Sequence, residues 1–286
     1  MNPTSETGVA RPVRRFRLWL YLLIVFAVSW PFLILSALLA RSVAESYAWN
    51  VTGMIMVTVG TFIAGRWVFR DGFRTAGWRW GSVRAWVLAL GLPLLIWAVP
   101  AGLDTLRGNR TLVPFAWDKV WLALAFVFFN PIPGFGEEFG WRGYLLPRQW
   151  RGSGGPRRAV LANSVIWWAW HLPLTLLPSI LNAPAIAASQ NIATEVFLLI
   201  ALPIQALAGL VTAACAGIIF CYVWVRSGSI AVASVFHGAY DAVRDTLALW
   251  LVGSSIVGGL LPILIIIVIA PLLLWRGQWV LPGNKD

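Results

Sequence analysis

The chain has 286 residues, of which 59% are hydrophobic and only 12% are charged. Soluble domains carry about 25% charged residues, so this composition excludes a water-soluble globular protein and indicates lipid as the solvent. The formal net charge is +11, but the basic residues lie in short clusters between apolar runs, as they do in juxtamembrane loops. We therefore expect a protein in contact with membrane lipid, and no nucleic-acid partner.

Eight apolar segments are long enough to cross a bilayer, which requires about 20 mostly apolar residues. The predicted spans are 18–40, 47–69, 85–103, 117–146, 159–178, 195–226, 229–251 and 255–275. The first follows a basic tail, residues 1–17, and is too long for a signal-peptide core, so it is predicted to be a retained helix. The fold class is thus all-α, a polytopic transmembrane helix bundle of about eight helices, with seven or nine as alternatives.

Prolines predict breaks in two of these spans. Asn130-Pro-Ile-Pro-Gly134 interrupts the fourth span, because two prolines remove backbone donors and disfavour a regular helix. The sixth span is longer than one crossing needs, and Pro203 is predicted to separate a short interfacial piece from a span that starts near residue 207.

The distribution of Lys and Arg predicts the orientation. Of the 22 basic residues, 16 fall in cytoplasmic segments if the N-terminus is cytoplasmic, 4 fall in outer loops, and Arg142 and Arg244 lie within spans. The positive-inside rule therefore favours cytoplasmic N- and C-termini. We expect an integral, multi-pass protein of a bacterial inner (plasma) membrane.

Ionisable residues within spans are costly, so they point to function. They form three groups here: Glu137, Glu138 and Arg142; then His171; then His237 with Asp241. Glu138 and Arg142 are four residues apart and can pair, as can His237 and Asp241, which leaves Glu137 free. The alternative is structural: a helix-end salt bridge with a solvated second glutamate, and histidines that only pack.

The three groups are predicted to lie at similar depth. At 1.5 Å per residue, His171 is about 18 Å, His237 about 12 Å and Glu137 about 14 Å from the cytoplasmic ends of their helices. They could therefore meet in one cavity on the cytoplasmic side. A carboxylate there can take a proton from water, one histidine can hold that water, and another can donate to an oxyanion. This is the chemistry of peptide hydrolysis.

The order Glu137-Glu138-x-x-x-Arg142, aromatic-x-x-x-His171 and His237-x-x-x-Asp241 resembles the CPBP (Abi) family, which includes CAAX proteases, bacteriocin-processing enzymes and type II CAAX prenyl endopeptidases. The resemblance covers roughly residues 117–251, a catalytic core between N-terminal helices in 18–116 and a last helix and short tail in 252–286. It implies an intramembrane endopeptidase that cleaves peptide or protein substrates, some of them lipidated, near the cytoplasmic side. Glu137 and His171 would activate water, His237 and Asp241 would stabilise the oxyanion, and Glu138 and Arg142 would support the site.

Asp241 departs from the family, which often has Asn at this position, and Trp167 stands where Phe is frequent. A charged Asp cannot donate a hydrogen bond, so Asp241 is either protonated, or orients His237, or binds a metal. The family has been discussed both as glutamate-type proteases and as metalloproteases. A divalent metal such as zinc could be held by Glu137, His171, His237 and Asp241, although their spacing differs from that of soluble His-Glu-x-x-His enzymes.

Three other functions stay open. His171 and His237 could be the axial ligands of a haem, which would leave the two glutamates and Arg142 without a role. Intramembrane Glu and His could instead form the relay of a proton-coupled transporter. Finally, the chain could be an inactive scaffold with the same fold.

Overall fold

The structure is a computed structural model that describes residues 16–152, 154–253 and 255–282, so most of the predicted basic tail, residues 1–15, lies outside the described residues. The described chain is almost entirely helical. Its α-helices are α1 (Leu18–Leu39), α2 (Val43–Ile63), α3 (Val83–Pro93), α4 (Val99–Leu106), α5 (Trp117–Phe129), α6 (Pro131–Glu138), α7 (Leu146–Gly152), α8 (Pro156–Trp170), α9 (Leu172–Leu181), α10 (Ala183–Ser189), α11 (Thr194–Val196), α12 (Leu202–Ser227), α13 (Ile230–Trp250) and α14 (Ile256–Arg276).

Shorter elements join or extend these helices. Four π-helical segments cover Ala64–Val68, Leu94–Ala98, Phe139–Leu145 and Phe197–Ala201, and a 3₁₀ turn covers Arg74–Ala76. The strands β1 (Thr111–Leu112) and β2 (Leu251–Val252) pair antiparallel.

Seven continuous helical stretches of the described chain are long and apolar enough to cross a membrane. They correspond to seven of the eight predicted spans. The remaining predicted span is α13, which has 21 residues but carries His237, Asp241, Arg244 and Asp245 and is not among the seven. The predicted fold class, a polytopic helical bundle, is confirmed.

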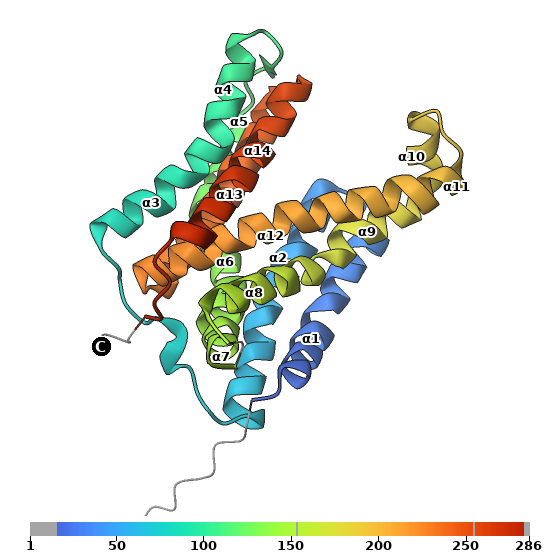
Figure 1. The fold of residues 1–286 in the computed structure, drawn as a ribbon. Coiled ribbons are helices and arrows are strands. Elements are labelled where there is room, and N and C mark those ends of the chain that lie inside the picture. Colours follow the sequence, from blue (N-terminus) through green and yellow to red (C-terminus); the bar gives the residue numbers. More distant parts are fainter. Residues whose placement is uncertain (1–15, 153, 254, 283–286) are drawn as a thin grey trace, which may run out of the picture.

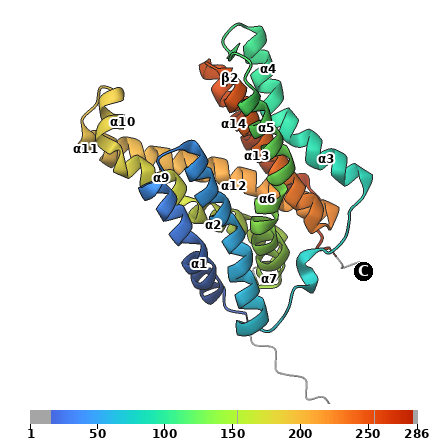
Figure 2. The ribbon, with the colours of Figure 1, turned by 180° about the vertical axis from the view of Figure 1, so that it is seen from behind.

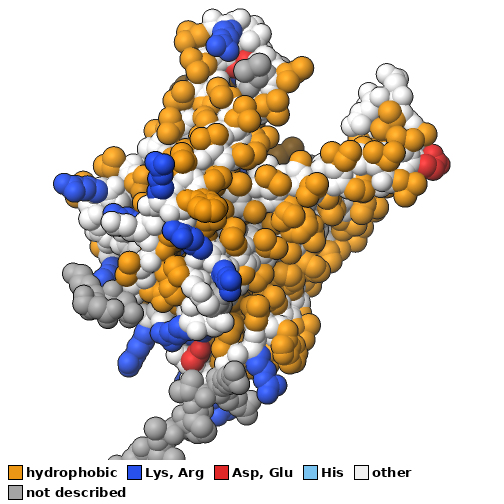
Figure 3. All heavy atoms as spheres, viewed as in Figure 1, with side chains coloured by type: hydrophobic (Ala, Val, Ile, Leu, Met, Phe, Trp, Pro, Cys, Tyr) orange, Lys and Arg blue, Asp and Glu red, His pale blue; other side chains and the backbone are white. Residues whose placement is uncertain are grey.

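The helices form two arms that diverge from a common base (Figures 1 and 2). One arm contains α3, α4, α5, α13 and α14, and the other contains α1, α2, α9, α10, α11 and the first part of α12. The short helices α6, α7 and α8 lie at the base, where the arms meet. Hydrophobic side chains cover both arms, whereas Lys and Arg side chains gather around the base (Figure 3).

Prolines divide two of the predicted spans, the fourth and the fifth, but not the sixth. The fourth is interrupted as predicted: α5 ends at Phe129, and α6 begins at Pro131, whose missing N–H is tolerated in a first helical turn. The predicted division at Pro203 is wrong: Pro203 lies in the first turn of α12, and the helical stretch runs without a break from Thr194 to Ser227. The segment predicted as one span over 159–178 is divided at His171, because Pro173 starts a new helix in α9.

Glycines allow the helices of the base to approach closely. A Cβ atom at Gly238 of α13 would lie 2.5 Å from the backbone nitrogen of Pro131, and one at Gly134 would lie 2.5 Å from the Ser234 carbonyl oxygen. A Cβ atom at Gly136 would lie 2.6 Å from the Met54 carbonyl oxygen of α2. Small residues at such crossings bring backbones into contact, as in membrane bundles generally. Helix α6 is therefore held between α2 and α13.

Candidate active site

The first motif occupies the end of α6 and the π-helical segment Phe139–Leu145, where every residue is buried. Arg142 Nη1 donates to Glu138 Oε1 at 2.8 Å, as the sequence spacing predicts. Both side chains are fully buried, and the guanidinium carbon of Arg142 lies 4.8 Å from the Trp167 ring centre and 5.1 Å from that of Phe220. These cation–π contacts offset part of the cost of burying the charge.

His237 of α13 is joined to this pair. Its Nδ1 lies 2.9 Å from the same Glu138 oxygen that Arg142 contacts. A carboxylate can only accept, so Nδ1 carries the proton of this hydrogen bond. The other nitrogen, Nε2, lies 3.5 Å from Asp241 Oδ2 on the next turn of α13. Glu138 thereby fixes the orientation of the His237 ring.

Glu137 points to a different partner, the indole of Trp167. Trp167 Nε1 donates to Glu137 Oε2 at 2.5 Å, and Glu137 is only 1% exposed. No hydrogen bond or ion pair of Glu137 Oε1 is found among the described residues. Glu137 therefore has one carboxylate oxygen that is held and another that is free to receive a proton.

His171 lies at the junction between α8 and α9 and is partly exposed. Its Nδ1 is 2.7 Å from the Trp167 carbonyl oxygen, which can only accept, so the proton resides on Nδ1. In the neutral ring Nε2 then presents its lone pair. Trp167 links all three groups: its indole donates to Glu137, and its ring centre lies 4.8 Å from that of His171 and 6.2 Å from that of His237. The structure thus brings the three predicted groups together.

Asp241 is the most accessible carboxylate of the cluster, with a side chain that is 19% exposed. Besides His237, it contacts Arg244, whose Nη1 is 3.0 Å from Asp241 Oδ1. Asp241 accepts from the Arg244 guanidinium and faces Nε2 of His237 at 3.5 Å, which fits a carboxylate that orients His237. Of the three roles left open by the sequence, this one agrees best with the contacts.

The cluster also contains side chains of the kinds that bind metal ions. Among the described residues, no three His, Cys, Asp or Glu side chains converge closely enough to hold a metal ion. Both histidines direct Nδ1 toward an oxygen acceptor, as metal-ligating histidines also do, but Nε2 of His237 faces Asp241 Oδ2 at 3.5 Å. Without three converging ligands the described residues do not form a zinc site, and the catalytic scheme has no step through a metal.

Several residues of the site could not be identified from motif spacing alone. Trp167 packs edge-to-face against His171, with ring centres 4.8 Å apart, and lies 6.2 Å from His237. Phe220 of α12 packs against His237 at 4.9 Å. The aromatic at the start of the second motif was the available signal for Trp167, whereas Phe220 lies in an apolar run without distinguishing neighbours.

The fold and these contacts define a polytopic membrane protein with a buried cluster of two glutamates, two histidines and an arginine. Residues 116–243, which contain all six predicted site residues, match a family model described as Type II CAAX prenyl endopeptidase Rce1-like. This match supports an assignment of the segment to the CPBP/CAAX protease family, which the motifs also indicated. No curated protein matches the chain.

Proposed function

We propose that the chain is an endopeptidase in which water activated by Glu137 and His171 attacks a peptide carbonyl within the membrane. The observation that carries this proposal is the environment of Glu137. Its carboxylate is almost completely buried, one oxygen is fixed by Trp167, and the other is free. A buried carboxylate that is held in one orientation and not neutralised by a direct ion pair is suited to act as a general base.

His171 completes the activation of water. Its Nε2 lone pair can accept one hydrogen bond from a water molecule while Glu137 Oε1 takes a proton from the same molecule. The hydroxide so formed attacks the peptide carbonyl, and the protonated Glu137 can then give its proton to the leaving amine. The contact of His171 with the Trp167 carbonyl supports this tautomer, because it keeps the proton on Nδ1.

His237 is proposed to stabilise the oxyanion through Nε2. Glu138 holds its Nδ1 proton, and Asp241 lies 3.5 Å from Nε2 in the absence of substrate. Between two carboxylates the ring can carry both protons, so Nε2–H can donate to a developing oxyanion that lies beside Asp241 while Glu138 keeps the ring in place. In this scheme Asp241 orients His237, and Glu138 and Arg142 position it.

The other functions receive less support. The Trp167 ring contacts both His171 and His237, so it occupies the space between them. Both nitrogens of His237 also face carboxylates. These contacts disfavour a haem held between the two histidines. A transporter relay would not require the fixed pair of Glu138 and Arg142. An inactive scaffold would not need to retain a free Glu137 oxygen beside a correctly oriented His171.

Proteomic comparison of membranes tests the function and identifies the substrate. Cells that produce the wild-type chain, Glu137→Gln or Glu195→Gln are compared for new and lost peptide termini; Glu195 is an exposed glutamate in α11 and serves as the control. Termini present with the wild type and Glu195→Gln, and absent with Glu137→Gln, would be the products. The same termini in all three samples would contradict the proposal.

A further inference from the structure

Helix α1 lies outside the segment that matches the family model, residues 116–243, yet it contacts the residue directly before His171. Trp30 Nε1 donates to the Trp170 carbonyl oxygen at 3.0 Å, and Trp170 Nε1 donates to Ser29 Oγ at 2.8 Å. Two neighbouring residues of α1 therefore hold both the backbone and the side chain of Trp170.

The break between α8 and α9 makes these contacts available. The last four carbonyl groups of a helix have no partner within it, and in α8 they belong to residues 167–170. The His171 ring binds the Trp167 carbonyl through Nδ1. The Trp170 carbonyl is instead bound by Trp30 of α1. A side chain of α1 thus completes the same helix end that orients the His171 ring.

The Trp170 indole also touches the imidazole of His171 directly. The two ring centres are 4.8 Å apart, and the ring planes meet at 86°. The Trp167 ring makes the same kind of contact with His171, at 4.8 Å and 84°. Each indole N–H is bound by a buried acceptor, which is Glu137 for Trp167 and Ser29 for Trp170. Rotation of the imidazole would therefore disturb two indoles that are each held by a hydrogen bond.

Ser29 has no other acceptor role that competes with this contact. Ser29 and Trp170 are both fully buried, at 0% exposure. The Ser29 hydroxyl donates to the Val25 carbonyl oxygen at 2.7 Å, so its oxygen is left to accept from the indole. Without that hydroxyl, a buried indole N–H would lose its acceptor, which is unfavourable in an interior without water. We therefore expect Trp170 to leave its place beside His171 when Ser29 is removed.

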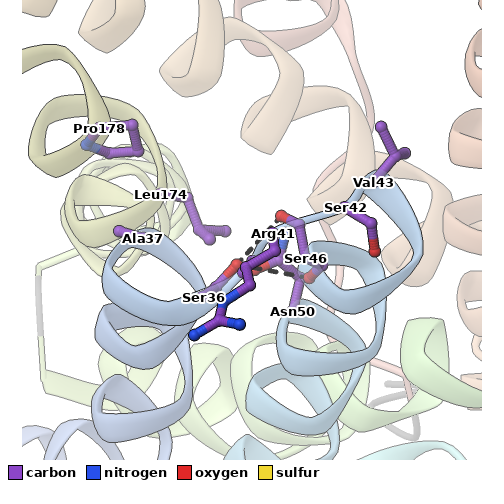
Figure 4. A pocket seen from close by; sticks show the side chains of 10 residues that line it. Ser36, Ala37, Arg41, Ser42, Val43, Ser46, Asn50, Leu174 and Pro178 are labelled. Carbon is purple, nitrogen blue, oxygen red and sulfur yellow. Dashed lines mark hydrogen bonds between the residues drawn. The ribbon is translucent and has the colours of Figure 1, made fainter. Parts of the chain in front are cut away.

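The side of α9 next to α1 and α2 leaves room for such a movement. A cavity of about 530 Å³ lies there, lined by Leu174 and Pro178 of α9 and by residues at the junction of α1 and α2 (Figure 4). Leu174 is three residues beyond His171, so the start of α9 has free space on this side. The position of His171 therefore depends on the contacts at the end of α8.

On the basis of the proposed function, we infer that Ser29 and Trp30 are positioning residues, which hold Trp170 and thereby keep the Nε2 lone pair of His171 directed at the catalytic water. Helix α1 then supports the active site as well as anchoring the chain in the membrane. This role requires no contact between α1 and the substrate, so substitutions of these residues should change kcat and leave KM nearly unchanged.

Nitrogen NMR of the histidines tests the positioning without a substrate. The chain has only two histidines, so protein labelled with ¹⁵N-histidine in lipid bilayers gives the signals of two imidazoles, and His237→Gln identifies those of His171. At alkaline pH, where the ring is neutral, the wild type should show a single His171 tautomer with the proton on Nδ1. Ser29→Ala and Trp30→Phe should add the signals of the other tautomer. An unchanged single tautomer in both variants, or a mixture in the wild type, would overturn the inference.

The chain offers matched controls for both substitutions. Ser36→Ala removes another buried hydroxyl of α1, which contacts Ser46 beside the cavity (Figure 4). Trp86→Phe removes an indole N–H that has no partner among the described residues. Both controls should leave the His171 signals as in the wild type. Equal changes in the controls and in the test variants would contradict a specific positioning role.

Kinetics test whether this positioning matters for catalysis. The probe is a fluorogenic peptide that ends in a farnesylated Cys-aliphatic-aliphatic-Ser sequence, the substrate type that the family description names. Ser29→Ala should lower kcat about tenfold, the effect of one hydrogen bond, with KM within about twofold of the wild-type value. Trp170→Phe keeps an aromatic ring but loses the same bond, so the double variant Ser29→Ala/Trp170→Phe should lose no more than the weaker single variant. Additive losses, or a wild-type kcat in Ser29→Ala, would overturn the inference.

The inference and the proposed function can fail separately. If the wild-type enzyme does not cleave the probe, the tautomer measurement still decides whether α1 positions His171. A second tautomer in Ser29→Ala and Trp30→Phe, absent from the controls, would then support the positioning contacts although the proposed cleavage had failed.

Discussion

Replacement of Arg142 alone should lower the unfolding free energy strongly. Replacement of its partner Glu138 in the same variant should recover much of that free energy. Arg142 and Glu138 form one hydrogen bond of 2.8 Å between two fully buried side chains. Arg142→Met removes the positive charge but leaves the Glu138 carboxylate buried. The double variant Glu138→Leu/Arg142→Met removes both charges and keeps similar apolar volume.

The magnitude follows from the contacts. Removing one partner of a buried ion pair costs about 3–5 kcal/mol, because the remaining charge stays in a low-dielectric interior. The lost cation–π contacts with Trp167 and Phe220 add about 0.5–2 kcal/mol each. The pair itself is incompletely satisfied: Glu138 Oε2 and Arg142 Nε and Nη2 have no partner among the described residues. A matched apolar replacement of both residues should therefore cost less than either single change.

Unfolding in mixed micelles, titrated with a denaturing detergent, provides the assay. We expect a loss of about 4–9 kcal/mol of unfolding free energy for Arg142→Met and a clearly smaller loss for the double variant. The double variant should nevertheless be inactive, because His237 loses the Glu138 oxygen that orients it. Additive losses in the double variant, or a loss below about 1 kcal/mol in Arg142→Met, would refute this reasoning.

Three further predictions concern the site and its packing. Asp241→Ala should lower kcat about 10- to 100-fold, because His237 loses the side chain that orients it. Asp241→Asn should lower kcat less, because an amide oxygen can still accept a hydrogen bond. Equal losses of kcat for the two variants in steady-state assays would contradict the orienting role. Gly238→Ala should destabilise the fold by about 1–3 kcal/mol, because the added Cβ would meet the Pro131 backbone. Gly91→Ala is the control, because a Cβ there meets nothing within 4 Å, and it should leave the thermal unfolding temperature unchanged or raise it. Chelators should leave the activity of the purified enzyme unchanged; inhibition that a divalent metal reverses would contradict the metal-free scheme.

The fold was predictable because a helix that crosses membrane lipid requires a long run of apolar residues. Leu18–Leu39 and Ile256–Arg276 agree with their predicted bounds to within a residue at each end. The prolines also predicted the break before α6. The division at His171 was missed, although Pro173 was an available signal, because a proline in a transmembrane run can also be tolerated within a continuous helix.

The site was predictable only in part. Spacing gave the pair of Glu138 and Arg142, since it depends on one helical turn. The contact of Trp167 with Glu137 joins residues that are 30 positions apart, and the sharing of Glu138 by His237 spans 99 positions. Such contacts depend on how α6, α8 and α13 cross, which periodicity does not encode.

The charge of the site was also difficult to anticipate. Asp241 and Arg244 are three residues apart, so their pairing was a local possibility, but Arg244 was treated as a residue left within a span. Their contact explains how a carboxylate can occupy a position where the family often has an amide. The departure from the family pattern is therefore accompanied by a neighbouring compensating charge.

The central claim is that Glu137 is the general base. The most direct measurement is the rate at which purified enzyme in proteoliposomes cleaves a substrate identified by the proteomic comparison of peptide termini. Glu137→Gln keeps the size of the side chain and an oxygen for the Trp167 indole, so it should unfold at the wild-type temperature. Its kcat should fall by about 10²- to 10⁴-fold, while Glu195→Gln retains full activity. A Glu137→Gln enzyme that cleaves at the wild-type rate would contradict the account.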